Sequence, residues 1–175
     1  MRSMIIRQAN RRDIPAIHEI YTEAVLTTTA TYDYEPRPLE HRIAWFDDHE
    51  KLDLPIFVSE GPGGEIQGWS ALNRFHDRPG YRYTVENSIY VAAAFRGRGV
   101  GKALLPPLIQ AGAERGYQCV IACIDATNEV SIRLHAGCGF ETMGRLKRVG
   151  YKFERWLDVV YMQRFLNQDP SANQT

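Results

Sequence analysis

A glycine-rich segment with three cationic side chains offers the clearest chemistry in the sequence. Residues 96–102 read Arg-Gly-Arg-Gly-Val-Gly-Lys. Glycines let the backbone approach a ligand closely, and successive N–H groups at the start of a helix point toward an anion. Arg96, Arg98 and Lys102 add local positive charge. The segment therefore predicts a site for a phosphate or pyrophosphate group, and a glycine-rich turn that only begins a helix remains the alternative.

Three phosphate-binding patterns can be compared with this segment. A Walker A loop requires glycine where Arg96 stands and Ser or Thr where Ala103 stands, so it fails at two positions. A dinucleotide-binding G-x-G-x-x-G has a different spacing from Gly97, Gly99 and Gly101. The pattern [Gln/Arg]-x-x-Gly-x-[Gly/Ala] is satisfied by Arg96, Gly99 and Gly101.

A strand and a helix are expected on either side of this segment. The residue pattern predicts a strand at residues 84–91 and a helix at residues 100–115. Pro106 and Pro107 fall inside that helix, where a proline removes a backbone hydrogen bond and crowds the preceding turn. We therefore expect a kink or an irregular turn at residues 102–107.

The rest of the chain predicts helices and strands of one mixed domain. Apolar residues at helical spacing predict helices at residues 14–25, 39–49 and 128–138. Apolar runs predict strands at residues 3–9, 55–58, 66–72, 119–124, 140–146 and 153–165. Asn10 and Asp13 have the spacing of a capping box, and residues 27–38 and 73–82 are expected to be loops. The order of elements indicates a single α/β domain over residues 1–166, with a polar tail at residues 167–175.

Composition argues against several classes of protein. Of the 175 residues, 44% are hydrophobic and 24% are charged, as in an ordinary globular domain. Lys+Arg and Asp+Glu number 21 each, so the net charge does not favour nucleic-acid binding and any anion site must be local. The cysteines are odd in number and lack a C-x-x-C pair, so we expect neither a disulfide framework nor a zinc site. Buried, reduced thiols are expected at Cys119, Cys123 and Cys138.

Membrane association and metal binding are not expected. No apolar stretch approaches the length of a membrane span, and the N-terminal residues lack the apolar region of a signal peptide. We therefore expect a cytoplasmic location. His18, His41, His49 and His76 share no metal-binding motif, so no metal site is expected.

Further motifs extend the reading of the glycine-rich segment. The pattern Asn128-x-x-Ser131-x-x-Leu134-His135-x-x-x-Gly139-Phe140 follows it in the chain. Both motifs resemble those of the GNAT superfamily of N-acetyltransferases, over nearly the whole chain. The resemblance narrows to the phosphinothricin and methionine sulfoximine acetyltransferase branch. The segments that carry it are residues 84–91, 131–135 and 150–153 and the pair Trp156-x-Asp158. Pro106-Pro107 departs from the family pattern.

The resemblance implies a fold, a cofactor and an assembly. The fold is α/β of the α+β type, with a mixed, mostly antiparallel, splayed sheet flanked by helices and parallel strands at the cofactor cleft. The acetyl donor is acetyl-CoA, and members are often homodimers. The implied coenzyme-binding residues are Ile89, Tyr90, Val91, Arg96, Gly97, Arg98, Gly99, Val100, Gly101, Lys102, Asn128 and Ser131.

Three groups are candidates for catalysis in such a cleft. Glu86 is the candidate base, acting directly or through water, and a surface glutamate is the alternative. The backbone N–H of Val91 is the implied oxyanion donor. His135 is the candidate proton donor to the leaving thiolate, because histidine changes charge near pH 7. A histidine that only hydrogen-bonds the cleft is the alternative at that position.

The acceptor site is expected beside the strand that carries Glu86. In this branch the acceptor is a small amino acid whose side chain ends in phosphinate, sulfone or sulfoximine oxygens. The expected substrate-binding residues are His76, Asp77, Arg78, Arg82, Glu86, Asn87 and Ser88. A solvated charged loop is the alternative for residues 74–82. Tyr32 and Tyr34 are expected on the opposite side, and Tyr151 and Trp156 line either the acceptor pocket or a dimer interface.

These observations predict an N-acetyltransferase that moves the acetyl group of acetyl-CoA to the amino group of a small amino acid by direct attack in a ternary complex. A peptide or protein N-acetyltransferase on the same fold is one alternative. It requires an open groove, against which the bulky segment 27–38 argues. A non-catalytic acyl-CoA-binding sensor is the other alternative, and the presence of Glu86 and His135 argues against it.

Overall fold

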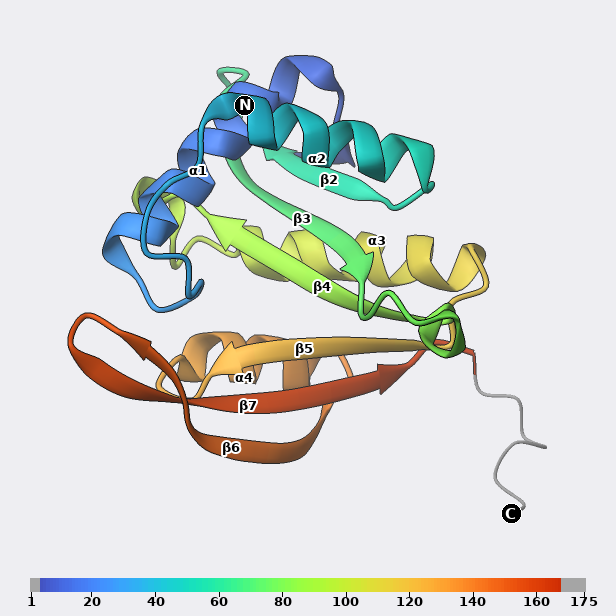
Figure 1. The fold of residues 1–175 in the computed structure, drawn as a ribbon. Helices are drawn as coiled ribbons and strands as arrows, with labels where there is room; N and C mark the ends of the chain where they lie inside the picture. The colour runs from blue at the N-terminus through green and yellow to red at the C-terminus, as the bar shows by residue number, and fades with distance from the viewer. Residues whose placement is uncertain (1–3, 168–175) are drawn as a thin grey trace.

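Alternating side chains on the central strands build a sheet that is covered by helices on both faces. The computed structural model describes residues 4–167, which include seven strands and four α-helices (Figure 1). The strands are β1 (Ile5–Gln8), β2 (Ile56–Glu60), β3 (Ile66–Arg74), β4 (Thr84–Val91), β5 (Cys119–Asp125), β6 (Glu141–Lys152) and β7 (Arg155–Phe165). The helices are α1 (Ile14–Thr27), α2 (Leu39–Lys51), α3 (Val100–Glu114) and α4 (Glu129–Gly137).

The strands form one sheet in the order β1-β2-β3-β4-β5-β7-β6. The pair β4 and β5 is parallel, and the other neighbouring pairs are antiparallel. Pairing between β4 and β5 covers residues 84–86 and 119–121, and within the described residues the two strands are not paired beyond that point. The sheet therefore opens between them (Figure 1). The mixed, splayed sheet expected from the sequence is confirmed.

Strand β3 shows how the sheet separates two cores. Trp69 and Ala71 pack with residues of α1 and α2, whereas Leu72 packs with residues of α3. Ser70, on the same face as Leu72, donates from its hydroxyl to the carbonyl of Leu104 in α3, at 3.3 Å. The period of two along β3 thus places α1 and α2 on one face and α3 on the other.

The segment between β1 and α1 forms a capping box, as its sequence predicts. The Asn10 side chain accepts from the N–H of Arg12, at 3.0 Å, and the Asp13 carboxylate accepts from the N–H of Asn10, at 2.8 Å. Asp13 is also paired with Arg7 of β1, at 2.7 Å. These contacts connect the first strand to the start of α1.

Helix α3 contains both prolines without interruption, so the irregular turn expected at residues 102–107 is absent. Pro106 and Pro107 leave the carbonyls of Lys102 and Ala103 without helical donors, which costs on the order of 3 kcal/mol for one interior proline. The sheet-facing side chains of the helix are fully buried and anchor it against β2, β3 and β4: Leu104, Leu105 and Leu108. Burial of this face holds the helix together across the prolines.

Two further expectations need correction. The last two strands are β6, ending at Lys152, and β7, beginning at Arg155, so the expected break at residues 147–152 is part of a long hairpin. Cys123 is exposed rather than buried, because β5 turns this side chain toward the opening beside β4. The expected tail lies outside the described residues apart from Asn167. Within residues 4–167, no helix is long and apolar enough to cross a membrane.

Candidate active site

A cavity of about 280 Å³ lies where β4 and β5 separate. It is lined by residues of β4, β5, α4 and the segment that follows α1. Nine residues expected in the site from the sequence line it together: Tyr32, Glu86, Asn87, Ser88, Ile89, Tyr90, Asn128, Ser131 and His135. The cavity therefore brings together residues from three distant segments of the chain.

Glu86 presents an unpaired carboxylate to this cavity. Its carboxylate has no hydrogen-bond or ion-pair partner within residues 4–167, although its side chain is half-buried. Burial raises the pKa of Glu86, and the nearby His76 acts in the opposite direction. A carboxylate whose pKa is raised toward the working pH is a better proton acceptor than an ordinary surface glutamate.

The backbone of β4 offers N–H groups to the same opening. The N–H of Ala92 donates to the carbonyl of Gln67 in β3, at 3.0 Å. Because successive N–H groups of a strand alternate in direction, those of Val91 and Ile89 point the other way, toward β5. Beyond residue 86 this side of β4 carries no strand pairing within the described chain. A ligand in the opening can therefore accept hydrogen bonds from β4 as an added strand would.

His135 is neutral, and both of its ring nitrogens form hydrogen bonds. It is 1% exposed, and burial lowers its pKa. Its Nδ1 lies 2.7 Å from the carbonyl oxygen of Ser131, which can only accept, so Nδ1 carries the proton. Its Nε2 then accepts from the side-chain amide nitrogen of Asn87, at 2.9 Å. Neither ring nitrogen has a free N–H directed into the cavity.

Asn87 is oriented by this contact. Because its Nδ2 donates to His135, its Oδ1 is turned away, and this buried oxygen has no hydrogen-bond partner among the described residues. A buried acceptor without a donor costs about 1–3 kcal/mol, so a donor from a ligand or water is expected there. Asn128 has a structural contact as well, since its side-chain oxygen accepts from the N–H of Ser131 at the start of α4, at 3.1 Å.

The glycine-rich segment lies at the end of β4 and leads into α3. Gly97 and Gly99 have positive φ angles of 73° and 82°, and Gly99 is the N-cap of α3. A Cβ on Gly101 would lie 3.2 Å from Leu134 in α4, so this glycine permits close packing between α3 and α4. Of residues 96–102, none lines the 280 Å³ cavity, so the segment lies next to it as a separate part of the site.

Arg96 holds this segment in place. Its Nε donates to the carbonyl of Val91, at 3.0 Å, and its guanidinium is paired with Glu23 of α1, at 2.9 Å. Glu23 also accepts from the N–H of Ala93, at 3.2 Å. The side chain that the sequence predicts as a cofactor contact therefore fastens the loop to β4 and α1, while Arg98 and Lys102 are exposed.

The segment that follows α1 contributes more residues to the cavity than the sequence predicts. Thr29, Ala30, Thr31 and Tyr32 line the cavity, and Tyr32 is the one of these expected there from the sequence. The buried ammonium group of Lys152 donates to the carbonyls of Thr28 and Thr31, both at 2.8 Å, and fastens this segment to the β6–β7 hairpin. A loop and a lysine more than a hundred residues apart carry no shared sequence signal.

Two other lining residues, Cys123 and Asp125, come from β5. Asp125 is buried, and its Oδ2 accepts from the hydroxyl of Tyr32 across the cavity, at 3.4 Å. Its other oxygen accepts from the N–H of Thr127, at 2.9 Å. Burial raises the pKa of both Tyr32 and Cys123. Strand alternation on β5 could have indicated these residues once β5 was known to border the opening.

The charged loop expected to bind the acceptor lies outside this cavity. His76, Asp77, Arg78 and Arg82 do not line it. Asp77 is paired with Arg74, at 3.6 Å, and the guanidinium of Arg82 lies 4.6 Å from the centre of the Tyr83 ring. Tyr34, expected near Tyr32, donates to the carbonyl of Tyr151 at 2.6 Å instead of lining the cavity. Within residues 4–167, no cluster of His, Cys, Asp or Glu could hold a metal ion.

The amino-acid sequence of this chain is similar to those of known acetyltransferases. The model of the acetyltransferase (GNAT) family matches residues 14–140. An L-methionine sulfoximine/L-methionine sulfone acetyltransferase of Pseudomonas aeruginosa is 41% identical over 98% of both chains. An L-amino acid N-acyltransferase of Escherichia coli is 37% identical over 97% of this chain and 99% of its own.

A solved structure extends the similarity to three dimensions. A phosphinothricin acetyltransferase of Sinorhizobium meliloti, in complex with acetyl-CoA, superposes with a TM-score of 0.93. The two chains are 35% identical over 99% of this chain and 94% of the other.

Proposed function

Because the chain belongs to the acetyltransferase (GNAT) family, we propose that it transfers the acetyl group of acetyl-CoA to the α-amino group of a small amino acid. Its relatives act on methionine sulfoximine, methionine sulfone, phosphinothricin and L-amino acids, by their names. These substrates share an α-amino acid group and differ in the side chain. The shared group is therefore the part of the acceptor that the site must recognise.

The observation that carries the proposal is the unpaired carboxylate of Glu86 in the cavity between β4 and β5. An ammonium group must lose a proton before it can attack a thioester. Glu86 can take that proton directly or through one water, and its raised pKa suits the task. The same carboxylate can first attract the charged ammonium form of the acceptor.

The acetyl transfer then proceeds in one active site. The amine nitrogen attacks the thioester carbonyl carbon, the new N–C bond forms, and the C–S bond breaks with its electron pair remaining on sulfur. The N–H of Val91, directed toward the opening, stabilises the negative charge that develops on the carbonyl oxygen. Acceptor and donor are held together in a ternary complex, so that positioning supplies much of the rate enhancement.

The donor site fits a coenzyme A thioester. The N–H group of Ile89 pairs with its amide-rich arm, and the side chain of Tyr90 borders the same opening. The N–H groups of the segment Gly97–Lys102 at the start of α3 receive the pyrophosphate. Asn128 and Ser131, at the start of α4, border the thioester end of the cavity.

His135 acts through Asn87 in this proposal. Its imidazole fixes the orientation of the Asn87 amide, and the free Oδ1 accepts a hydrogen bond from a bound substrate. Protonation of the leaving thiolate is left to solvent or to the proton carried by Glu86. Among the residues expected at the acceptor side, the proposal retains Glu86, Asn87 and Ser88, and His76 lies near enough to Glu86 to affect its pKa.

The experiment that tests the function is a thiol-release assay with acetyl-CoA and a panel of amines. The panel contains methionine sulfoximine, methionine sulfone, phosphinothricin, a polyamine and a short peptide. We expect turnover of one or more of the α-amino acids and none of the peptide or polyamine. Preferential turnover of the peptide would support the peptide acetyltransferase instead. Acetyl-CoA binding without turnover of any amine would support the sensor.

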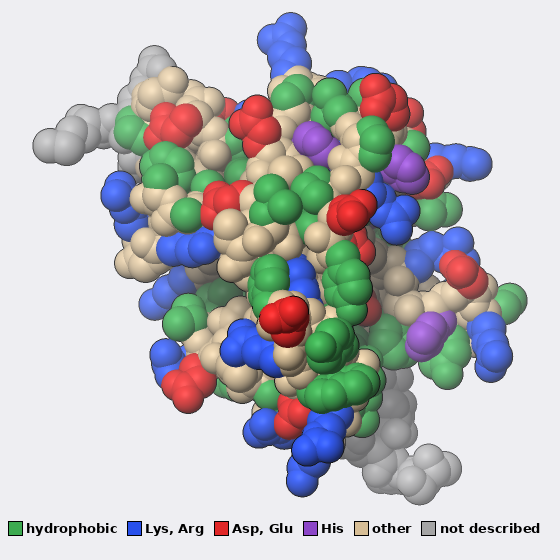
Figure 2. All heavy atoms as spheres, turned by 60° about the vertical axis from the view of Figure 1, so that its left-hand side comes forward, with side chains coloured by type: hydrophobic (Ala, Val, Ile, Leu, Met, Phe, Trp, Pro, Cys, Tyr) green, Lys and Arg blue, Asp and Glu red, His purple; other side chains and the backbone are tan. Residues whose placement is uncertain are grey.

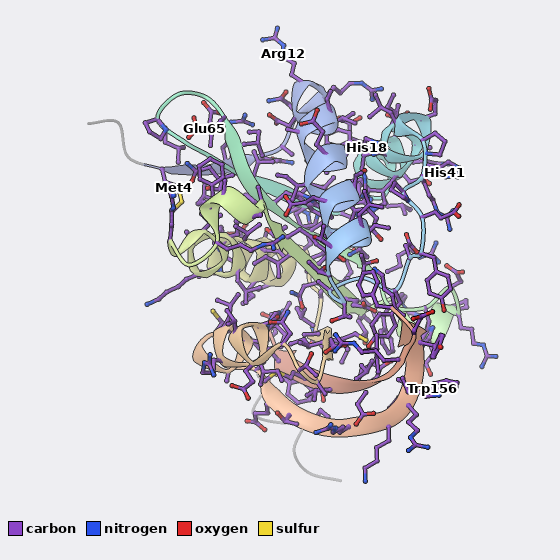
Figure 3. All side chains as sticks on the ribbon, turned by 90° about the vertical axis from the view of Figure 1, so that its left-hand side faces the viewer. Met4, Arg12, His18, His41, Glu65 and Trp156 are labelled. Carbon is purple, nitrogen blue, oxygen red and sulfur yellow. The ribbon has the colours of Figure 1, made fainter. Side chains whose placement is uncertain are left out.

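We also propose that the chain forms a homodimer through the β6–β7 hairpin. Large apolar side chains are exposed on this hairpin: Leu146, Val149, Tyr151, Phe153 and Trp156. Figure 2 shows hydrophobic side chains gathered low on the face where the hairpin comes forward, and Figure 3 shows Trp156 on its outer side. Contiguous exposed apolar surface of this kind marks an interaction site. Trp156→Glu is expected to convert a dimer into a monomer in light scattering, and a wild-type monomer would contradict the proposal.

A further inference from the structure

A second cavity, of about 330 Å³, lies on the face of the sheet that α1 and α2 cover. Tyr21 of α1, Arg42 and Trp45 of α2, Trp69 of β3 and Tyr90 of β4 contribute to its wall. His18 of α1 and His41 of α2 also line it, and Figure 3 shows both at the same end of the molecule. The aromatic wall gives the cavity a fixed shape, because the Trp69 ring lies 5.0 Å from that of Tyr90 and 5.5 Å from that of Trp45.

Arg42 is held in this cavity by aromatic rings. The central carbon of its guanidinium lies 4.5 Å from the ring centre of Tyr21, 4.6 Å from that of Trp45 and 5.4 Å from that of Trp69. The guanidinium forms no ion pair or hydrogen bond with any residue from 4 to 167, and its Nε is buried. Burial lowers the pKa of Arg42, but arginine stays charged at neutral pH. An immobilised cation with five donors and no protein acceptor is prepared for an anion.

Trp69 contributes its aromatic ring to the wall, while its indole N–H is enclosed by protein atoms. Its side chain is 1% exposed, and its indole N–H is buried without a hydrogen-bond partner in the described chain. The Arg42 side chain is only half-buried, so the rest of its guanidinium can meet an anion in the cavity. Such a ligand supplies oxygen acceptors.

The charges of the residues that line the cavity also favour an anionic ligand. Arg37 and Arg42 are cationic, whereas Asp33 is the acidic residue of the lining. One oxygen of Asp33 already accepts from the hydroxyl of Tyr21, at 2.9 Å. The described lining thus carries more positive than negative charge even when the histidines are neutral.

The second cavity adjoins the proposed site of acetyl transfer. Ser88 and Tyr90 line both cavities. Glu86 lies on the same face of β4 as these two residues, and two residues of a strand span about 7 Å. An oxyanion bound beside Ser88 is therefore within the length of one small amino acid from the carboxylate of Glu86.

We propose that the second cavity is the subsite for the α-carboxylate of the acceptor, with the Arg42 guanidinium as its donor. This inference rests on the proposed function, because it assigns a place to one group of the proposed α-amino acid. The subsite selects α-amino acids over simple amines. It leaves the acceptor side chain free to differ, as it does among the substrates named above.

The test compares methionine sulfone with its α-amide, which keeps the amine and the side chain but lacks the carboxylate. The variants are Arg42→Met, which keeps an apolar stem against the aromatic rings, and Arg42→Lys, which keeps the charge. Arg12→Met is the matched control, because Arg12 is exposed and points away from the body of the molecule (Figure 3). Thermal unfolding and the KM for acetyl-CoA report whether each variant is folded.

The wild type is expected to prefer the acid over the amide in kcat/KM by roughly 10- to 100-fold, the range for losing a hydrogen bond to a charged group. Arg42→Met should reduce this ratio to about one, Arg42→Lys should give an intermediate ratio, and Arg12→Met should preserve it. Calorimetric binding of acid and amide in the presence of CoA gives the same comparison without turnover.

Three results would overturn the assignment. One is an equal loss for acid and amide in Arg42→Met, which indicates a structural role for the arginine. Another is an unchanged ratio in both variants. The third is a loss seen for methionine sulfone relative to methionine, with the acid-to-amide ratio intact, which puts the side-chain oxygens in the cavity instead. Absence of wild-type turnover contradicts the proposed function, whereas the binding ratio tests the carboxylate subsite on its own.

Discussion

Replacement of Gly99 by alanine tests whether the glycine-rich segment receives acetyl-CoA. Gly99 has φ of 82° and ψ of 2° at the N-cap of α3. A side chain in this left-handed conformation costs about 1–2 kcal/mol. No described atom lies within 4 Å of the position that a Cβ would occupy, so the penalty is conformational and not a clash.

Because the loop around Gly99 is open, it can relax to avoid the penalty, and the binding-competent conformation becomes less populated. A cost of about 1–2 kcal/mol corresponds to a weakening of roughly 5- to 30-fold in the Kd for acetyl-CoA. Calorimetry measures this Kd, and thermal unfolding should change little.

Gly80→Ala is the matched control for Gly99→Ala. Gly80 is equally open, and its φ is not positive. We expect wild-type affinity in this variant. A Kd for Gly99→Ala within twofold of the wild type, or an equal loss in Gly80→Ala, would refute the role of the segment.

Three further variants probe the cavity. Glu86→Gln should lower kcat by about 10²- to 10⁴-fold. Because burial raises the pKa of Glu86, the ionised carboxylate destabilises the folded state of the wild type. Glu86→Gln should therefore unfold at a higher temperature than the wild type at pH 7. Below about pH 4.5, where the carboxyl group is protonated in both folded and unfolded wild type, the two proteins should unfold at the same temperature. Lys152→Met removes two hydrogen bonds to the segment at Thr31 and should lower the free energy of unfolding in urea by about 1–3 kcal/mol. His135→Gln should raise KM more than it lowers kcat, because His135 orients Asn87. Burial lowers the pKa of His135, so the folded state favours the neutral imidazole. The free energy of unfolding of the wild type should therefore exceed that of His135→Gln by the largest amount above pH 6.5, and the difference should shrink as the pH falls. Unfolding curves at several pH values measure this difference.

Much of the fold could be predicted because local signals agree with the tertiary structure. Strand β4 matches the expected residues 84–91, and the Asn10–Asp13 capping box forms as its spacing indicates. Alternation along β4 also separates Glu86 and Ser88 from Asn87 and Ile89. In each case the structure depends on residues that are close together in the sequence. Such local patterns can be recognised without knowledge of the tertiary structure.

The β6–β7 turn could not be predicted in this way. Phe153 and Glu154 occupy it with φ angles of 51° and 58°, where glycine or asparagine is the usual signal. The hairpin imposes this conformation through the pairing of Lys152 with Arg155. Strand pairing thus overrides the local backbone preference of Phe153 and Glu154. Because neither residue is Gly or Asn, the sequence predicts that the strand continues through these positions.

The second cavity could not be predicted for a related reason. Arg42, Trp45 and Trp69 read as ordinary helix and core residues, and their common cavity exists because α2 packs over β3. The loop at residues 76–82 carries more obvious charge, yet it lines neither of the two cavities.

The most direct test of the account is mass-spectrometric analysis of the products formed from acetyl-CoA and methionine sulfoximine. We predict acetylation at the α-nitrogen, with one CoA released for each acetylated product. Glu86→Gln should form this product far more slowly at every pH at which the wild type is active. An unmodified amino acid alongside released CoA, or wild-type rates in Glu86→Gln, would contradict it.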